Sequence, residues 1–213
     1  MSADVKIGDK WLSADMGWIF SEKSISPPEP NLVLIEIPGT SAVIDLTESL
    51  SGDIEYKQRK LGVALISDDG KKSYYSKFSE LANTIHGKKE RIIFSDDAGF
   101  FWIGRVAVTK ADPTFYGQTV EISATVDPYK YEVNPETYSI STFPGDLTIV
   151  GNRKHISPVI TCSNVGMVSY LENNYPLTAG INRIPEIFFG AGEHVLTFAG
   201  SGTTSVDYQG ASL

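Results

Sequence analysis

The amino-acid sequence predicts a mainly β protein, with an N-terminal β domain that contains one α-helix and a small C-terminal β-sandwich. Three observations support this prediction. Residues 118–126 alternate between apolar and polar side chains, which is the period of a half-buried strand. Other short segments rich in Ile, Val and aromatic residues are separated by Gly, Asn, Asp and Pro. One segment has the period of an amphipathic helix instead.

The first part of the chain reads as strands joined by turns. In addition to residues 118–126, strands are expected at residues 31–37, 53–66, 91–94 and 100–110. The stretches Asp68-Asp69-Gly70 and Asp96-Asp97-Ala98-Gly99 predict turns, because Asp and Gly favour turn conformations. Within the long segment 53–66, Gly62 predicts a β-bulge that switches the alternation.

The helix is predicted over residues 76–86. Its apolar side chains fall at i, i+3, i+4 and i+7, at Phe78, Leu81, Ala82 and Ile85. Ser73 or Ser76 is suited to cap the start, and Gly87 is suited to end the helix in the left-handed conformation. The apolar stripe is expected to cover one face of the neighbouring sheet.

The composition changes after Glu136. Residues 1–136 carry 15 Lys and Arg and 21 Asp and Glu, whereas residues 137–213 carry 3 and 5. Short strands typical of a small β-sandwich are predicted at residues 147–150, 157–162, 165–171, 182–188, 193–199 and 205–208. Pro128 and Pro135 mark the joint, because proline disfavours helix before it and removes a backbone donor. The expected domains are therefore residues 1–134 and 135–213.

Charge and hydropathy exclude two classes of partner. The formal net charge of -8 opposes sequence-independent binding to nucleic acid, which needs clustered Lys and Arg. No run of apolar residues is long enough to span a bilayer, and no basic region leads into an apolar run as in a signal peptide. We therefore expect a protein made in the cytoplasm, without membrane insertion. The single cysteine, Cys162, is expected to be buried and inert.

A search for catalytic and cofactor motifs finds none that fits. His86, His155 and His194 lie far apart and lack the spacing of local metal ligands. Nucleophile-elbow, phosphate-loop and dinucleotide patterns are absent. The adjacent carboxylates of the two Asp-Asp pairs point apart on an extended chain and suit turns better than glycosidase chemistry. We expect no enzyme activity, no cofactor and no metal.

One basic cluster leaves two readings open. Lys57, Arg59 and Lys60 lie on the long predicted strand. They are explained either as a solvated face that protects a sheet edge or as a contact between subunits, in which Arg59 pairs with a neighbour's carboxylate.

Several segments together resemble the distal tail proteins of siphophages. The first is Pro38-Gly39 through Asp45-Leu46-Thr47-Glu48, followed by Tyr56-Lys57-Gln58-Arg59. The second is the helix with His86-Gly87-Lys88, then Trp102-Ile103-Gly104-Arg105-Val106, and the third is Asp127-Pro128-Tyr129-Lys130-Tyr131. The last runs from Gly151-Asn152 to Val206-Asp207-Tyr208. The resemblance rests on their order and spacing over nearly the whole chain.

The resemblance implies a structural role at the tail tip of a virion. It implies a homo-hexameric ring formed by the N-terminal domain, followed by a galectin-like C-terminal domain that faces outward. The implied partners are the tail tube protein, the tail-associated hub protein and receptor-binding parts. DNA would pass through the ring without specific binding. At 213 residues the chain leaves no room for an added carbohydrate-binding module or a long arm.

Two other functions compete with this one. The C-terminal sandwich could act as a carbohydrate-binding module in adsorption to the cell wall, which requires an outward aromatic side chain with polar groups near it. A wall hydrolase ranks third, because no catalytic constellation supports it.

Overall fold

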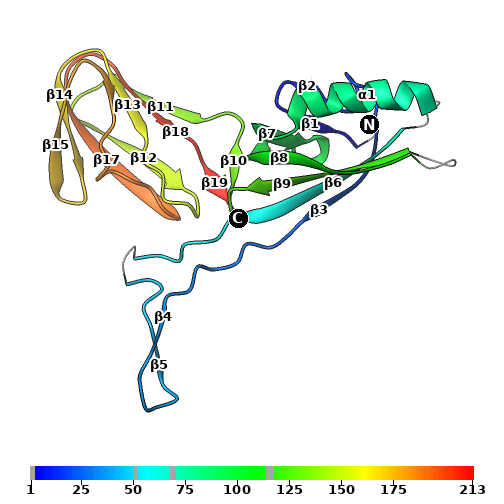
Figure 1. Cartoon of the computed structure of the whole chain (residues 1–213). Helices are drawn as coiled ribbons and strands as arrows, with labels where there is room; N and C mark the ends of the chain where they lie inside the picture. Colours follow the sequence, from blue (N-terminus) through cyan, green and yellow to red (C-terminus); the bar gives the residue numbers. More distant parts are fainter. Residues whose placement is uncertain (1–2, 50–51, 68–70, 114–117) are drawn as a thin grey trace. The chain divides into compact units, whose positions relative to one another are not determined.

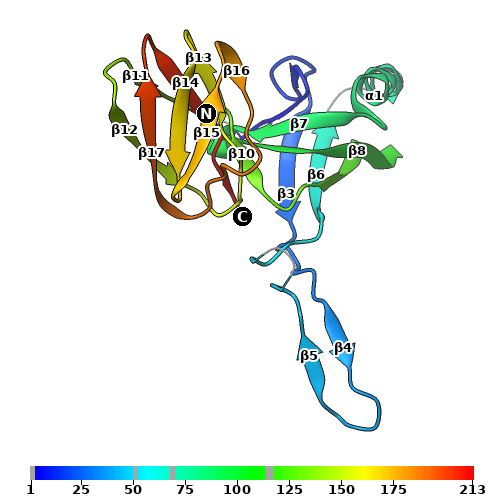
Figure 2. The same cartoon turned by 90° about the vertical axis from the view of Figure 1, so that its left-hand side faces the viewer.

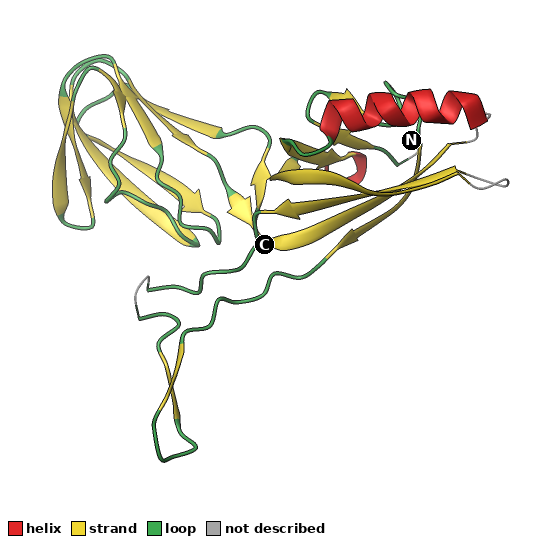
Figure 3. Cartoon of the chain, viewed as in Figure 1, coloured by secondary structure: helices red, strands yellow, loops and turns green. Residues whose placement is uncertain are grey.

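The computed structural model describes residues 3–49, 52–67, 71–113 and 118–213, and it is mainly β, as predicted. The chain divides into two compact units, Met1–Pro128 and Tyr129–Leu213. Each unit has its own hydrophobic core. Figure 3 shows strands in both units and one long α-helix in the first. The turn expected at Asp68-Asp69-Gly70 lies outside the described residues.

An antiparallel sheet forms the body of the first unit, in the strand order β2-β1-β7-β8-β9-β6-β3. Its strands are β1 (Val5–Ile7), β2 (Lys10–Trp11), β3 (Ile19–Ile25), β6 (Arg59–Ser67), β7 (Lys89–Phe94), β8 (Phe100–Pro113) and β9 (Gln118–Val126). The predicted bounds of β9 are confirmed, because its even positions are buried while Glu121 and Thr125 are exposed. The sheet thus has a core face and an outer face that carries polar and small side chains.

The helix α1 (Lys71–Ile85) lies across the core face of this sheet, as Figure 1 shows. It begins earlier than predicted, because Tyr74 extends the buried stripe of Leu81 and Ile85 by one turn. Ser73 and Ser76 therefore lie inside the helix, and their expected role as its cap is wrong. Gly87 ends it with φ 76°, as predicted.

The connection between β7 and β8 is a short 3₁₀ helix, η1 (Ser95–Asp97), within the stretch expected to turn. The bulge expected at Gly62 is wrong, because β6 pairs with β9 without a register shift. Space explains the glycine instead, since a Cβ there would lie 2.6 Å from Ser24 Oγ. The shifts in this sheet lie elsewhere, between Phe20 and Glu22 and between Val108 and Lys110.

Between β3 and β6 the chain leaves the sheet as a long hairpin, which we call the arm (residues 26–58). It contains two short strands, β4 (Leu34–Glu36) and β5 (Val43–Asp45). Figures 1 and 2 show the arm projecting away from the sheet of the first unit.

The arm corrects three expectations from the sequence. The strand at residues 31–37 is reduced to β4, and the strand at residues 53–66 begins only at Arg59. Pro30 and Tyr56 form an isolated bridge at the base of the arm instead of a continuous strand pair. The expectation that the chain has no room for a long arm is wrong for the first unit.

The second unit is a sandwich of two four-stranded antiparallel sheets. One contains β11 (Glu136–Ile140), β18 (Thr204–Tyr208), β13 (Val159–Cys162) and β16 (Gly180–Asn182), in that order. The other contains β12 (Gly145–Gly151), β17 (Gly192–Gly200), β14 (Gly166–Tyr170) and β15 (Asn173–Leu177). Ile160 and Val206 from the first sheet and Val168 and Phe198 from the second share one core. A short pair, β10 (Lys130–Glu132) and β19 (Ala211–Ser212), completes the unit.

Most strands expected in this unit are present, with one exception. The strand predicted at residues 182–188 is wrong, because only Asn182 belongs to a strand, β16. Ile187 donates a backbone hydrogen bond to the Ile184 carbonyl in a turn and is fully buried. The apolar run therefore supplies core without extended pairing. Cys162 is buried, as predicted.

Candidate functional site

The three histidines have separate partners. His86 accepts a hydrogen bond at Nδ1 from the Val108 amide at 3.0 Å. His194 lies 2.8 Å from the Tyr170 hydroxyl through Nδ1 and 2.9 Å from the Gly190 carbonyl through Nε2. In the described part of the chain, no group of three or more His, Cys, Asp or Glu side chains could hold a metal ion.

The acidic pair at Asp96 and Asp97 sits in η1. Lys23 Nζ donates to the Asp96 carboxylate, and this hydrogen bond holds the pKa of Asp96 below its usual value. The same ammonium lies 4.7 Å from the centre of the Phe94 ring. The ion pair of Asp96 with Lys23 therefore links β3 to the β7–β8 connection, which is a structural role.

None of the described helices is long and apolar enough to cross a membrane.

The arm exposes an unusual amount of apolar surface. Its large apolar side chains are between 37% and 55% exposed, and they are Leu32, Val33, Leu34, Ile35, Ile37, Val43 and Ile44. A two-stranded hairpin is marginal in water without a surface to pack on. Contiguous exposed apolar residues of this kind mark a site of interaction with another protein.

The arm is also acidic throughout. From Ser24 to Tyr56 the sequence has six Asp and Glu and no Lys, Arg or His. The acids are Glu29, Glu36, Asp45, Glu48, Asp53 and Glu55. A partner surface for the arm must therefore offer cations together with apolar or small side chains.

Local hydrogen bonds hold the arm in shape. At its tip, Thr40 donates its amide to the Ile37 carbonyl, with Pro38 and Gly39 (φ 83°) between them, as in a type II turn. On the return strand, Asp45 Oδ1 accepts from the Thr47 amide, and Thr47 Oγ1 accepts from the Val33 amide. The side-chain and backbone hydrogen bonds of Thr47 lower the pKa of Asp45. The Asp45-Leu46-Thr47-Glu48 motif thus closes the hairpin.

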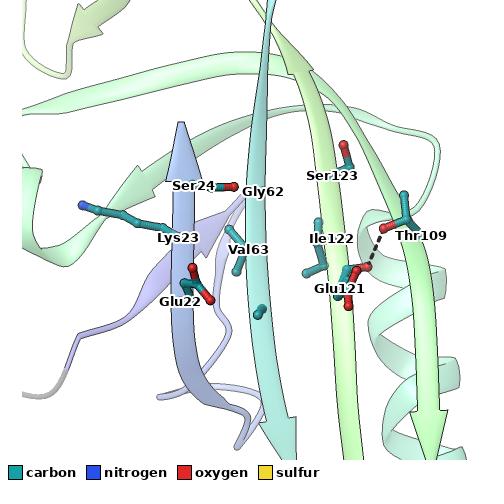
Figure 4. Close-up of a pocket in the computed structure, with 10 residues that line it drawn as sticks. Glu22, Lys23, Ser24, Gly62, Val63, Thr109, Glu121, Ile122 and Ser123 are labelled. Atoms are coloured by element: carbon teal, nitrogen blue, oxygen red, sulfur yellow. Dashed lines mark hydrogen bonds between the residues drawn. The ribbon is translucent and has the colours of Figure 1, made fainter. Parts of the chain in front are cut away.

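The outer face of the first unit's sheet carries a shallow groove of about 290 Å³. Its floor includes Gly62 and Ala64 on β6 and Ser123 on β9. Figure 4 shows Glu22 and Glu121 on either side of this floor, with Lys23 pointing away from it. Because the side chains of its floor are small, the backbone of another chain can approach this groove closely.

A row of cations crosses the same face beside the groove. The strand register aligns Lys60 on β6, Thr125 on β9, Arg105 on β8 and Lys89 on β7. All four side chains are exposed. We call these residues the cationic row. Like charges opposite each other on paired strands, as at Arg105 and Lys89, are destabilising without an anion between them.

The three cations singled out by the sequence do not form one cluster. Lys57 lies at the base of the arm, with Nζ 3.9 Å from Glu29 Oε2. Lys60 belongs to the cationic row. Arg59 is 8% exposed on the opposite face, where its guanidinium stacks 4.1 Å from the centre of the Trp102 ring. The sequence therefore identified one end of the row, while Arg105 and Lys89 were missed.

The sequence contains part of the information needed to find the cationic row and the arm. The strand alternation of β8 and β9, once their register is known, puts Arg105 beside Thr125. That register includes a shift between Val108 and Lys110 that no local pattern reveals. The absence of cations from Ser24 to Tyr56 is visible directly and would have separated the arm from the sheet.

In the second unit, Phe188 is the aromatic side chain that most resembles a binding platform. It is 43% exposed, and its ring centre lies 5.3 Å from that of His155. An outward ring beside a polar ring is the arrangement that a carbohydrate-binding module requires.

Comparisons with known proteins give a full-length structural match. No protein-family model matches the chain, and no curated protein matches it. The crystal structure of the Dit protein (gp 19.1) of phage SPP1 matches 100% of both chains with a TM-score of 0.74 and 14% sequence identity. That protein is described as a paradigm of the hub adsorption apparatus in phages that infect Gram-positive bacteria. The resemblance drawn from the sequence motifs is thereby confirmed at the level of the fold.

Proposed function

We propose that this chain, which has the fold of a phage distal tail protein, is a structural subunit of the tail tip of a long non-contractile-tailed phage or prophage. Six copies close a ring that joins the tail tube to the host-adsorption apparatus. The fold likeness over the full length of the SPP1 protein supports this role. The observation that carries it is the arm, because a hairpin with so much exposed apolar surface needs a partner protein.

The energy available to such a contact is substantial. Full burial of a Leu, Ile or Val side chain is worth about 1.5–3 kcal/mol relative to full exposure. The arm's seven large apolar residues are each roughly half exposed. Completing their burial therefore offers roughly 5–10 kcal/mol to an assembly, before the entropy of association is subtracted.

The shape of the contact favours a ring. An arm and the surface that receives it are different parts of the chain, so their contact is heterologous, and repetition of such a contact closes a ring when the rotation fits. We propose that DNA passes through the channel without specific binding. A lumen dominated by acidic side chains would agree with the net charge of -8.

We assign ring formation to residues 1–134 and an outward position to a galectin-like domain at residues 135–213. The proposed subunit contacts remain Lys57, Arg59 and Lys60. Of the two that lie on β6, Lys60 is exposed and Arg59 is buried. The tail tube protein and the tail-associated hub protein are the proposed neighbours on the two faces of the ring. Receptor-binding parts would attach to the outward domain, and the role requires neither catalysis nor a cofactor.

Substitution of the arm's apolar residues tests this proposal. We expect Leu34→Ser/Ile35→Ser/Ile44→Ser to convert the assembly to a monomer in light scattering, because the contact loses its apolar surface. The matched control is Val165→Ser/Ile181→Ser/Val195→Ser, which alters three exposed apolar residues of the second unit. A wild-type chain that stays monomeric at high concentration, or an arm variant that assembles like the control, would argue against the proposal.

The alternative function is a carbohydrate-binding module used in adsorption to the cell wall. The exposed Phe188 ring beside His155 favours it. Saturable binding of cell-wall saccharides in calorimetry, abolished by Phe188→Ala, would support this function. Such binding would be compatible with the ring, since the two functions use different units.

A further inference from the structure

We propose that the acidic arm of one copy docks on the cationic row of a second copy, with its carboxylates against Lys60, Arg105 and Lys89. This inference rests on the proposed ring, because it names the surface that receives the arm. It follows from the charges of the arm, the spacing of the cations and the small side chains next to them.

The two sides of the hairpin differ in character. Side chains alternate along a strand, so Leu34 and Glu36 share one side with their cross-strand partners Asp45 and Val43. The other side carries the Ile35–Ile44 pair and is apolar. The hairpin therefore has one mixed acidic and apolar side and one purely apolar side.

The spacing of the charges matches. Glu36 and Asp45 are diagonal neighbours on paired strands, which places their positions about 7–8 Å apart. Adjacent strands lie about 4.8 Å apart. Lys60 and Arg105 are two strands apart, so roughly 10 Å separates their backbone positions. Arg105 and Lys89 lie on adjacent strands, about 5 Å apart. Two carboxylates at this separation fit between three cations.

The cations of the row can bind anions from another chain. Arg105 Nη1 donates to the Gly87 carbonyl at 2.6 Å, which satisfies one of five N–H groups of the guanidinium. Within the described residues, no ion pair links Lys60, Arg105 or Lys89 to a carboxylate of the same chain. A carboxylate from another chain would relieve the repulsion between the opposed cations.

The next row on the same face can accept Leu34 and Val43, the apolar side chains on the mixed side of the hairpin. The register aligns Ser24, Gly62, Ser123 and Ala107, all of them small. Beyond them lie Glu22 and Glu121, on either side of Ala64, and Lys110 Nζ lies 3.3 Å from Glu121 Oε1. Glu22 would repel an acidic arm and Glu121 already has a cation beside it, so the hairpin is expected to turn its carboxylates toward the cationic row.

The occupant is a second copy and not the chain's own arm. The exposure of the arm's apolar residues shows that it does not lie on its own sheet. Each copy carries both the acidic arm and the cationic row, so one contact repeats from copy to copy in the manner that a ring needs.

Charge reversal on each side of the contact tests the inference. Lys60→Glu/Lys89→Glu gives a chain with an acidic hairpin and an acidic row. Glu36→Lys/Asp45→Lys gives one with a basic row and with lysines in place of the two acids of β4 and β5, while the four other acids of the arm stay. We expect the dissociation constant of each variant alone to rise at least tenfold, as measured by mass photometry. An equimolar mixture should recover the wild-type assembly, because the charges on β4 and β5 of each chain then meet a row of opposite charge. Recovery on mixing also shows that both variants are folded.

The matched control is Lys10→Glu/Arg183→Glu, which changes the net charge equally at two exposed cations outside the row. The docking site is overturned if the row variant assembles like this control, or if the mixture stays monomeric while the wild type assembles. In that case the proposed ring survives with another docking site. A wild-type chain that never assembles overturns both the ring and the docking site.

Discussion

At the scale of single residues, Arg59 shows how strand alternation separates neighbours in the sequence. Lys60 lies on the outer face, whereas Arg59 is buried over Trp102. Among the described residues, no acceptor reaches Arg59 Nε. Burial lowers the pKa of this guanidinium, and the aromatic ring is its main stabilising contact. A cluster of cations in the sequence is therefore not a cluster in space.

We predict that Arg59→Met changes the free energy of unfolding by less than about 1 kcal/mol. Met keeps the apolar contact with Trp102 and removes a buried charge that has no anion beside it. Trp102→Ala serves as the comparison and should lose about 3–5 kcal/mol, because it leaves a large cavity. Urea unfolding measures both, and a loss of more than about 2 kcal/mol for Arg59→Met would show that the guanidinium has a strong partner besides the Trp102 ring.

Tyr138 gives a pH-dependent prediction. Its hydroxyl donates to the Glu136 carboxylate, and this bond raises the pKa of Tyr138 to about 12. Because the folded pKa exceeds that of the unfolded chain, the stabilisation is complete below pH 10 and is lost as the pH rises toward 12. In absorbance titration at high pH, Tyr138→Phe should remove one tyrosine whose ionisation is shifted above pH 10. Loss of a tyrosine that ionises near its ordinary pKa would contradict the hydrogen bond.

At the scale of elements, strand β9 and the apolar stripe of α1 were predictable, whereas the arm was not. Strand β9 and the stripe of α1 follow their expected periods because their partners are in the same unit. Residues 31–37 have the composition of a sheet strand, yet they belong to a hairpin whose large apolar side chains stay between 37% and 55% exposed. Composition alone cannot reveal which chain supplies the partner.

The tight pairing of β8 with β9 is tested by a pair of glycine substitutions. In Gly104→Ala the new Cβ would lie 2.2 Å from the Thr125 backbone oxygen, so the strands must separate. We expect a loss of about 1–3 kcal/mol in the free energy of unfolding. Gly99→Ala is the matched control, because a Cβ there meets nothing within 4 Å. Equal stability of the two variants in urea unfolding would contradict the described register.

At the scale of the whole molecule, the two units have separate cores, and this separation was visible in the sequence as a change of charge density. The joint was expected near residue 134, whereas the contacts divide the chain at Pro128. The prolines indicate where the chain stays extended, but β10 begins between them. Proline spacing therefore locates the joint only approximately.

Calorimetry of core variants tests whether the units unfold separately. Leu81→Ala and Phe198→Ala each remove a fully buried side chain, one from each core. We expect losses of about 2–5 kcal/mol for each, with Leu81→Ala lowering the transition of the first unit and Phe198→Ala that of the second. If both variants shift one common transition by the same amount, the chain unfolds as a single cooperative body.

The central claim is that this chain closes a six-membered ring through its arm. Native mass spectrometry of the wild-type chain measures this most directly, because it counts the copies in the assembly. The expected result is a species of six chains of 23.2 kDa, with six-fold rings around a central hole in electron micrographs of the same sample. A chain found only as a monomer, or an assembly that has another copy number and no closed ring, would contradict the claim.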